Sequence, residues 1–191
     1  MPREAHSAMK GKSHVTIGIV TYASVWAQPL GPLHAPLLAD SPAPQGLLVG
    51  LLVVALGSLL PDIDHAEGTL ARERVAGVPV FKLVAWGVGA VFGHRGPTHS
   101  LLALAALLLL GEFPWFPWAF ANLGWLLGWG YALHLAADAL TKAGIPLFWP
   151  LPARFGLPPW RRLRLTTGSW REGVTVLALM IACIANAVRA L

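Results

Sequence analysis

The sequence predicts an all-α, polytopic integral membrane bundle with about five spans. Three observations carry this prediction. The 191-residue chain is 55% hydrophobic and only 12% charged, whereas a soluble domain usually carries about 25% charged residues. Its apolar residues gather in runs separated by loops rich in proline, glycine and charge. The segments that connect these runs are alternately rich and poor in lysine and arginine. We expect a single domain over residues 1–191, with four to six spans.

Five apolar runs are the candidate spans, and two of them have a clear boundary signal. The five runs lie near residues 14–28, 46–60, 98–111, 118–140 and 173–190. Pro61 ends the second run, and Gly96-Pro97 predicts a sharp turn before the third. Thr98 is the expected N-cap of the third helix, which would place His99 in its first turn. Some runs fall short of the roughly 20 apolar residues that span a bilayer.

The lysines and arginines divide unevenly between the two faces of this arrangement. Thirteen of the 14 fall on one side, and only Arg189 falls on the other. The positive-inside rule makes the basic side cytoplasmic, with the N-terminus inside and the C-terminus outside. A signal peptide cleaved after Ala27 is the alternative for the first run. Cleavage would remove His14 and reverse the side of the new N-terminus, against the charge pattern.

The same arrangement brings several ionisable motifs to the cytoplasmic face. The candidate metal ligands are His14, Asp62, Asp64, His94, His99, His134 and Asp138. The i, i+4 spacing of His134 and Asp138 places both on one helix face. An extended segment after Pro61 would aim both carboxylates of Asp62 and Asp64 the same way. These residues, distant in sequence, are therefore expected to meet at one site.

Mixed imidazole and carboxylate ligands favour a divalent transition metal, with zinc or manganese preferred over magnesium or calcium. With His65 as a further member, there are more candidate ligands than one ion needs. The site could therefore hold two ions. Such pairs are common in phosphoester hydrolysis. Arg95 would then stabilise charge on the substrate, and Asp64 or His65 would be the general base.

Each motif also has a plainer interpretation. His134 and Asp138 could form a hydrogen bond that fixes helix packing, and the acidic motif could be a helix end facing water. We expect Arg161-Arg162-Leu163-Arg164 to attract lipid headgroups rather than nucleic acid, because the basic residues lie between apolar runs. His6 and His34 are expected to face solvent. A metal transporter and a non-catalytic membrane scaffold remain the other function classes.

Three motifs in order, GSLLPDIDH (57–65), GHRGPTHS (93–100) and GYALHLAAD (130–138), followed by LFWP (147–150), resemble the YdjM family. The resemblance covers about residues 12 to 155. It implies a helical protein of the bacterial inner membrane, described as a metal-dependent hydrolase and in some cases controlled by LexA. The family's substrate is not established. We expect the substrate to be a phosphoester in or near the lipid, either a membrane lipid or a small molecule.

Overall fold

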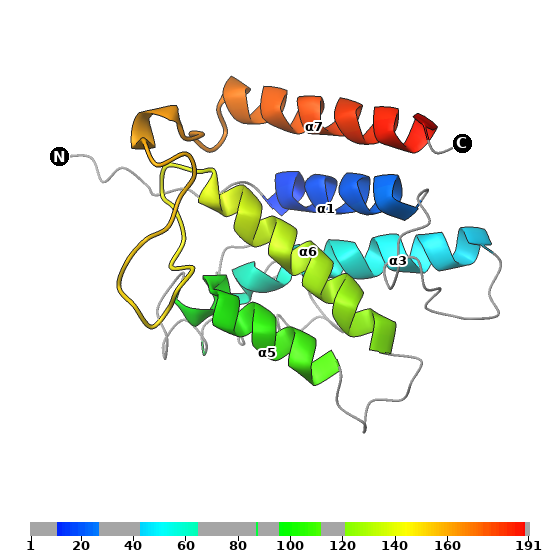
Figure 1. The fold of residues 1–191 in the computed structure, drawn as a ribbon, viewed down its shortest axis with the longest axis horizontal. Helices are drawn as coiled ribbons and strands as arrows, with labels where there is room; N and C mark the ends of the chain where they lie inside the picture. The colour runs from blue at the N-terminus through cyan, green and yellow to red at the C-terminus, as the bar shows by residue number, and fades with distance from the viewer. Residues whose placement is uncertain (1–10, 27–42, 65–86, 88–95, 112–120, 190–191) are drawn as a thin grey trace.

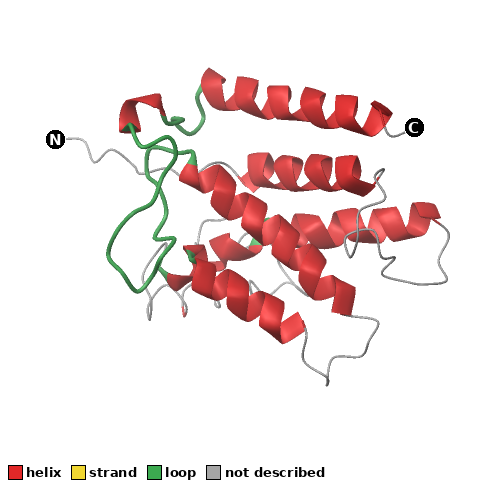
Figure 2. Cartoon of the chain, viewed as in Figure 1, coloured by secondary structure: helices red, strands yellow, loops and turns green. Residues whose placement is uncertain are grey.

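The computed structural model of the chain describes residues 11–26, 43–64, 87, 96–111 and 121–189 (Figure 1). This part of the chain is helical and contains no strand, only two isolated β-bridges (Figure 2). The longer helices are α1 (Gly11–Trp26), α3 (Ala43–Gly57), α5 (Leu101–Gly111), α6 (Ala121–Ala139) and α7 (Trp170–Arg189). Short 3-10 turns are η1 (Leu60–Asp64), η3 (Pro97–His99) and η5 (Arg161–Leu163). The predicted all-α class is confirmed, and each expected span holds one helix.

Helix α6 lies at the centre of the bundle. It packs against α1, α3 and α5, while α7 lies against α1 (Figure 1). Successive helices run in opposite directions (Figure 1). One end of the bundle therefore holds the starts of α1, α5 and α7 and the ends of α3 and α6. This is the end toward which the sequence directs the ionisable motifs.

Two glycines let α3 and α6 approach closely. A Cβ added at Gly130 of α6 would overlap the Val54 carbonyl oxygen, and a Cβ added at Gly57 of α3 would overlap the Leu127 carbonyl oxygen. Tyr22 of α1 closes the adjoining core against the same pair of helices. Small residues allow backbones to come this near in membrane helix bundles. The contact fixes the axial position of α6 against the end of α3, where the first acidic motif begins.

By length and composition, one helix in the described part of the chain could cross a membrane, namely α7 with its 20 residues. The segment Gly46–Gly57 and helix α5 are apolar but shorter. The 11 residues of α5 rise by about 16 Å, about half of the roughly 30 Å hydrocarbon core. The described part of the chain therefore contains one helix of spanning length, and the count of about five spans stays a prediction.

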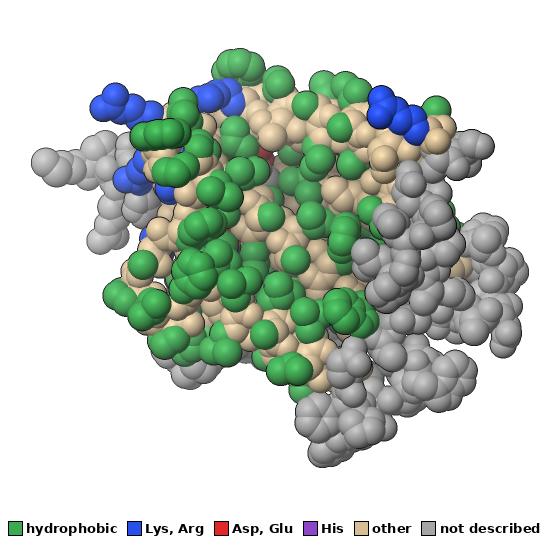
Figure 3. All heavy atoms as spheres, in the orientation of Figure 1, with side chains coloured by type: hydrophobic (Ala, Val, Ile, Leu, Met, Phe, Trp, Pro, Cys, Tyr) green, Lys and Arg blue, Asp and Glu red, His purple; other side chains and the backbone are tan. Residues whose placement is uncertain are grey.

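The outer faces of the helices are apolar. Figure 3 shows hydrophobic side chains over much of the face formed by α5, α6 and α7, with basic side chains near the two ends of α7. The exposed large hydrophobic residues include Leu48, Leu52, Leu56, Leu102, Leu109, Leu177, Ile181 and Ile184. Apolar surface this extensive marks an interaction with lipid or protein rather than with water.

The connection before α5 differs from the sequence prediction in one respect. Thr98 is not the N-cap of α5, because Pro97–His99 form the separate turn η3. Ser100 takes that place, since its Oγ accepts from the Ala103 N–H at 3.3 Å. The 3-10 turn ends at Ser100, whose extended backbone starts the new helix one residue later. His99 is consequently held in η3 rather than in the first turn of α5.

The loop between α6 and α7 is tied back onto the helix ends. The Leu157 N–H donates to the Ala139 carbonyl at 2.8 Å, and the Leu165 N–H donates to the Leu140 carbonyl at 2.8 Å. The Leu101 N–H at the start of α5 donates to Leu147 at 2.9 Å. These hydrogen bonds place the loop beside the end of α6.

Candidate metal centre

Five ionisable side chains converge where α1 begins and α6 ends. They come from α1, η1, η3 and α6 and are His14, Asp62, His99, His134 and Asp138. The His14 Nε2 lies 3.3 Å from Asp138 Oδ1. The His99 Nε2 lies 3.6 Å from Asp62 Oδ1 and 3.7 Å from Asp138 Oδ2. The His134 Nε2 lies 3.8 Å from the same two oxygens.

The cluster is closed to solvent. Four of its side chains are fully buried, and Asp62 is 9% exposed. Within the described residues, the Nε2 atoms of His14, His99 and His134 and the Oδ1 atom of Asp62 have no hydrogen-bond partner. A buried polar atom without a partner costs about 1–3 kcal/mol. A cation at their common point would offset this cost.

The separations within the cluster fit ligands of a shared ion. Bonds of about 2.0–2.2 Å at tetrahedral angles place two ligand atoms about 3.4 Å apart. The observed nitrogen–oxygen distances of 3.3 to 3.8 Å match that spacing better than they match hydrogen bonds. Two groups have all ligand atoms within 4.8 Å of one another: His14, His134 and Asp138, and Asp62, His99 and His134. These buried groups could hold a metal ion.

Hydrogen bonds on the far side of two imidazoles leave their Nε2 atoms free to bind. The His134 Nδ1 lies 2.7 Å from the Ser58 carbonyl oxygen, which can only accept, so this nitrogen carries the proton. The Thr98 hydroxyl donates its one proton to Asp64 Oδ2 at 3.0 Å. It must therefore accept from the His99 Nδ1, which lies 3.2 Å away. Outer partners of this kind orient metal-binding histidines and raise their basicity.

Further contacts hold these groups in place. The Tyr131 hydroxyl of α6 donates to the Thr98 carbonyl. The rings of His14 and His134 stack with their centroids 3.7 Å apart, and His99 meets His134 edge-on at 5.4 Å. The ring of each histidine therefore contacts a residue from another part of the chain.

The electrostatic environment keeps Asp62 ionised. Burial alone would raise the pKa of this carboxyl, but its polar interaction with His99 and the attraction of His134 outweigh burial. The pKa of Asp62 is therefore held below its ordinary value. A carboxylate that stays charged in a buried site is in the state that a metal requires.

The structure brings together five of the predicted metal ligands. Asp64 is buried next to them, but its Oδ2 accepts from Thr98. The expected extended Asp62–Asp64 segment is instead the 3-10 turn η1, and the alternative of an acidic motif facing water is wrong, because both carboxylates are buried. His65, His94 and Arg95 lie outside the described residues, as do His6 and His34, so their predicted roles stay predictions.

Several supporting residues were not predicted from the sequence. The buried Glu172 of α7 accepts from Ser13 Oγ at 2.7 Å and from the Gly168 N–H at 2.6 Å, which ties the start of α7 to the residue before His14. A signal for it exists. Ser169 and Glu172 have the spacing of a capping box before an apolar run, and Ser169 Oγ accepts from the Glu172 N–H at 3.4 Å. The parts played by the Ser58 carbonyl and Tyr131 have no comparable sequence signal.

Fold and site together define a helical membrane protein with a buried His–Asp cluster at one end of its bundle. The family model of the YdjM inner membrane protein matches residues 9–190. The chain belongs to this family, as its three motifs predicted.

Named relatives agree with this family. The chain is 45% identical over 107 residues to "Inner membrane protein YdjM" of Escherichia coli (strain K12) and, to the same extent, of Shigella flexneri. The match covers 54% of this chain and 50% of each relative, so the chain spans about half the length of these relatives. It is also 34% identical over 128 residues to "Uncharacterized protein YvsG" of Bacillus subtilis (strain 168), covering 67% of this chain and 71% of that protein. No solved structure matches the chain. The relatives' names support an inner-membrane location.

Proposed function

We propose that the chain is a membrane-bound, metal-dependent hydrolase that acts on a phosphoester or lipid-linked substrate at the cytoplasmic membrane face. One observation carries the proposal: three imidazole nitrogens and two carboxylates are buried together at the spacing of metal ligands. Ionisable groups inside membrane proteins are costly and mark functional sites. Membership of the family supports the membrane location and not the reaction itself.

The residues have distinct parts in this proposal. The five clustered side chains would hold a divalent transition metal, zinc or manganese in view of the mixed nitrogen and oxygen donors. When bound, such an ion polarises a phosphoryl group and lowers the pKa of water. Asp64 orients His99 through Thr98. The roles of Asp64 or His65 as general base, and of Arg95 on the substrate, remain part of the proposal.

The two alternative classes fit the described residues less well. A transporter needs polar groups along the membrane depth, whereas the buried histidine, aspartate and glutamate side chains of the described residues gather at one end of the bundle. A non-catalytic scaffold has no use for three imidazole nitrogens that are left without hydrogen-bond partners.

The test is metal analysis of the purified protein, followed by a screen of phosphomonoesters, phosphodiesters and phospholipids with and without a chelator. The wild-type protein should carry metal and hydrolyse at least one class, and the chelator should abolish the activity. His134→Ala should lose both metal and activity, and adding His99→Ala should cause little further loss, because the ligands act as one unit. His34→Ala is the matched control, because His34 is predicted on the opposite side. This variant should keep both its metal and its activity.

Two results would contradict the proposal. Bound metal without hydrolysis of any phosphate class would favour one of the alternatives. Metal movement across proteoliposome membranes would identify the transporter among them.

A further inference from the structure

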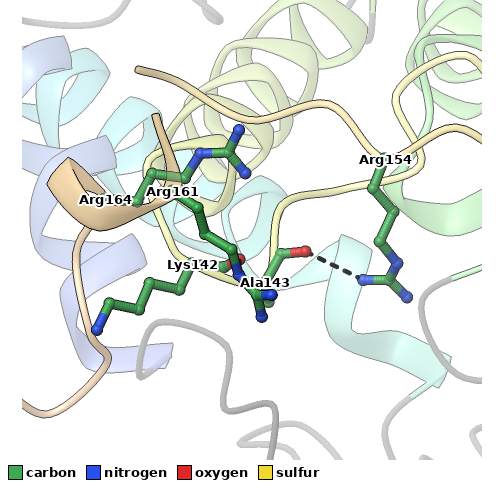
Figure 4. Close-up of a pocket in the computed structure, with 5 residues that line it drawn as sticks. All are labelled: Lys142, Ala143, Arg154, Arg161 and Arg164. Carbon is green, nitrogen blue, oxygen red and sulfur yellow. Dashed lines mark hydrogen bonds between the residues drawn. The ribbon is translucent and has the colours of Figure 1, made fainter. Parts of the chain in front are cut away.

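The loop between α6 and α7 borders an open, basic cavity separate from the metal centre, and three of the cationic residues that line it are exposed. Its volume is about 320 Å³, and it is lined by Lys142, Ala143, Arg154, Arg161 and Arg164 (Figure 4). Four of these five residues are cationic and none is acidic. Cations that line one cavity repel one another, and an anion bound between them would offset that repulsion.

One of the four cations is already used to build the loop. The Arg164 guanidinium donates to the carbonyl oxygens of Gly156 at 2.9 Å, Pro158 at 2.8 Å and Pro159 at 3.2 Å. This side chain folds the loop into its observed shape. It is therefore part of the cavity wall and a poor choice for a test substitution.

The other three cations keep most of their donors available. The Arg161 Nε donates to the Lys142 carbonyl at 3.2 Å, and one Arg154 nitrogen lies 3.4 Å from each of the Ala143 and Gly144 carbonyls. In Figure 4, Arg154 and Arg161 approach this main-chain segment from opposite sides. A guanidinium has five N–H donors and an ammonium has three. Single contacts to the main chain orient these side chains without saturating them.

The surroundings of the cavity indicate where its ligand comes from. Trp160 is 69% exposed, Leu163 is 55% exposed and Leu157 is 45% exposed, all on the same loop. Tryptophan and basic residues together are typical of the membrane–water interface. The cavity also adjoins the metal centre in sequence, since only three residues separate Lys142 from Asp138.

We propose that this cavity binds a phosphate group, the chemistry that planar arginine donors recognise in paired hydrogen bonds. The exposed apolar residues beside it favour an anionic phospholipid headgroup as the source, and a free phosphate carries the same chemistry. The site does not depend on the proposed hydrolase function, because none of its residues belongs to the metal cluster.

The test compares two double variants of the full chain in a non-ionic detergent. Arg154→Gln/Arg161→Gln removes two cavity donors. Arg162→Gln/Arg171→Gln removes the same charge from exposed positions that do not line the cavity. Binding of short-chain phosphatidylglycerol, inorganic phosphate and uncharged diacylglycerol is measured by native mass spectrometry. An unchanged thermal unfolding temperature in the same detergent would show that both variants keep the native fold.

The cavity variant should bind phosphatidylglycerol about tenfold or more weakly, as expected for lost charged hydrogen bonds, and the control should bind it as the wild type does. Phosphatidylglycerol binding much tighter than phosphate binding assigns the cavity to lipid headgroups. Equal affinities assign it to free phosphate. An equal loss in both double variants, or diacylglycerol binding as tight as that of phosphatidylglycerol, would overturn the proposal.

Discussion

At the scale of single residues, His134 connects more of the site than any other side chain described here. Its ring is stacked on His14, it meets His99 edge-on, and its Nδ1 is engaged by the Ser58 carbonyl. Only the Nε2 lone pair remains for a metal. Both groups that could hold an ion include His134. The two groups therefore compete for one nitrogen atom.

This competition predicts one ion per chain. A lone pair binds a single cation, so the two overlapping groups cannot both be filled through His134. Metal analysis by plasma mass spectrometry, normalised to protein by amino-acid analysis, should give one equivalent. His134→Ala should lower it to the background level. Two equivalents in the wild-type protein would show that the carboxylates hold a second ion without this imidazole.

The two aspartates of the acidic motif should respond differently to substitution. Asp62→Asn replaces a carboxylate that faces two imidazole nitrogens directly, so bound metal should fall to the background level. Asp64→Asn alters only the hydroxyl that orients His99, and losses at such outer positions are about 10–100-fold in affinity. Competition with a metal-binding dye measures both. A larger loss for Asp64→Asn would place that carboxylate among the direct ligands.

The sequence predicted which motifs meet but not which atoms face each other. The i, i+4 pair in α6 and the charge pattern were sufficient to predict that His14, His99 and Asp138 lie close together. They could not separate the parts of Asp62 and Asp64, because an extended segment and a 3-10 turn aim a D-x-D pair differently. Thr98 and Ser100 are both acceptable caps, and only the turn geometry decides between them.

At the scale of elements, helix existence was predictable and helix packing was not. In α3, Val53 and Val54 are buried, whereas Leu52 and Leu56 are exposed. All four are strongly apolar, so hydrophobic periodicity cannot tell which face meets the protein and which meets lipid. The informative residues are the glycines, since only they permit the close approach of α3 to α6.

The contact between these helices makes Gly130 a sensitive position. Gly130→Ala should destabilise the protein by about 1–3 kcal/mol, the range for overpacking, because its methyl group would overlap the Val54 carbonyl. Bound metal should fall as well, since His134 lies one helical turn further along α6. Thermal unfolding in detergent and metal content measure the two effects.

Gly173→Ala is the matched control for this substitution. It also lies in a helix, but nothing is within 4 Å of the added methyl group. Its stability should be unchanged or slightly raised by the better helix propensity of alanine. Equal effects at the two positions would show that helix propensity, not packing against α3, sets the result.

At the scale of the whole molecule, the alternating helices and the uneven charge lead to the same topology. The helix ends that carry the cluster share one end of the bundle (Figure 1). Thirteen of the 14 lysines and arginines fall on the corresponding side of the predicted spans. We therefore expect this end of the bundle to face the cytoplasm.

Reporter fusions test this orientation. A reporter fused after Leu191 should report the periplasm, and one placed within residues 142–171 should report the cytoplasm. Alkaline phosphatase and a fluorescent protein, each active on only one side, give opposite readings at the two positions. The reverse pair of results would remove the cytoplasmic face from the proposed function while leaving the metal cluster itself intact.

The order in which the chain is made gives the cluster a further meaning. His14 in α1 is synthesised before His134 and Asp138, which belong to α6 and follow three of the other long helices in sequence. Since synthesis proceeds from the N-terminus, the full ligand set cannot exist until α6 has joined α1 and α3. Metal capture would then follow helix assembly instead of directing it. A retained ion would mark a chain whose central helix has been completed and correctly placed, and a chain released before that point would reach the membrane unable to keep one.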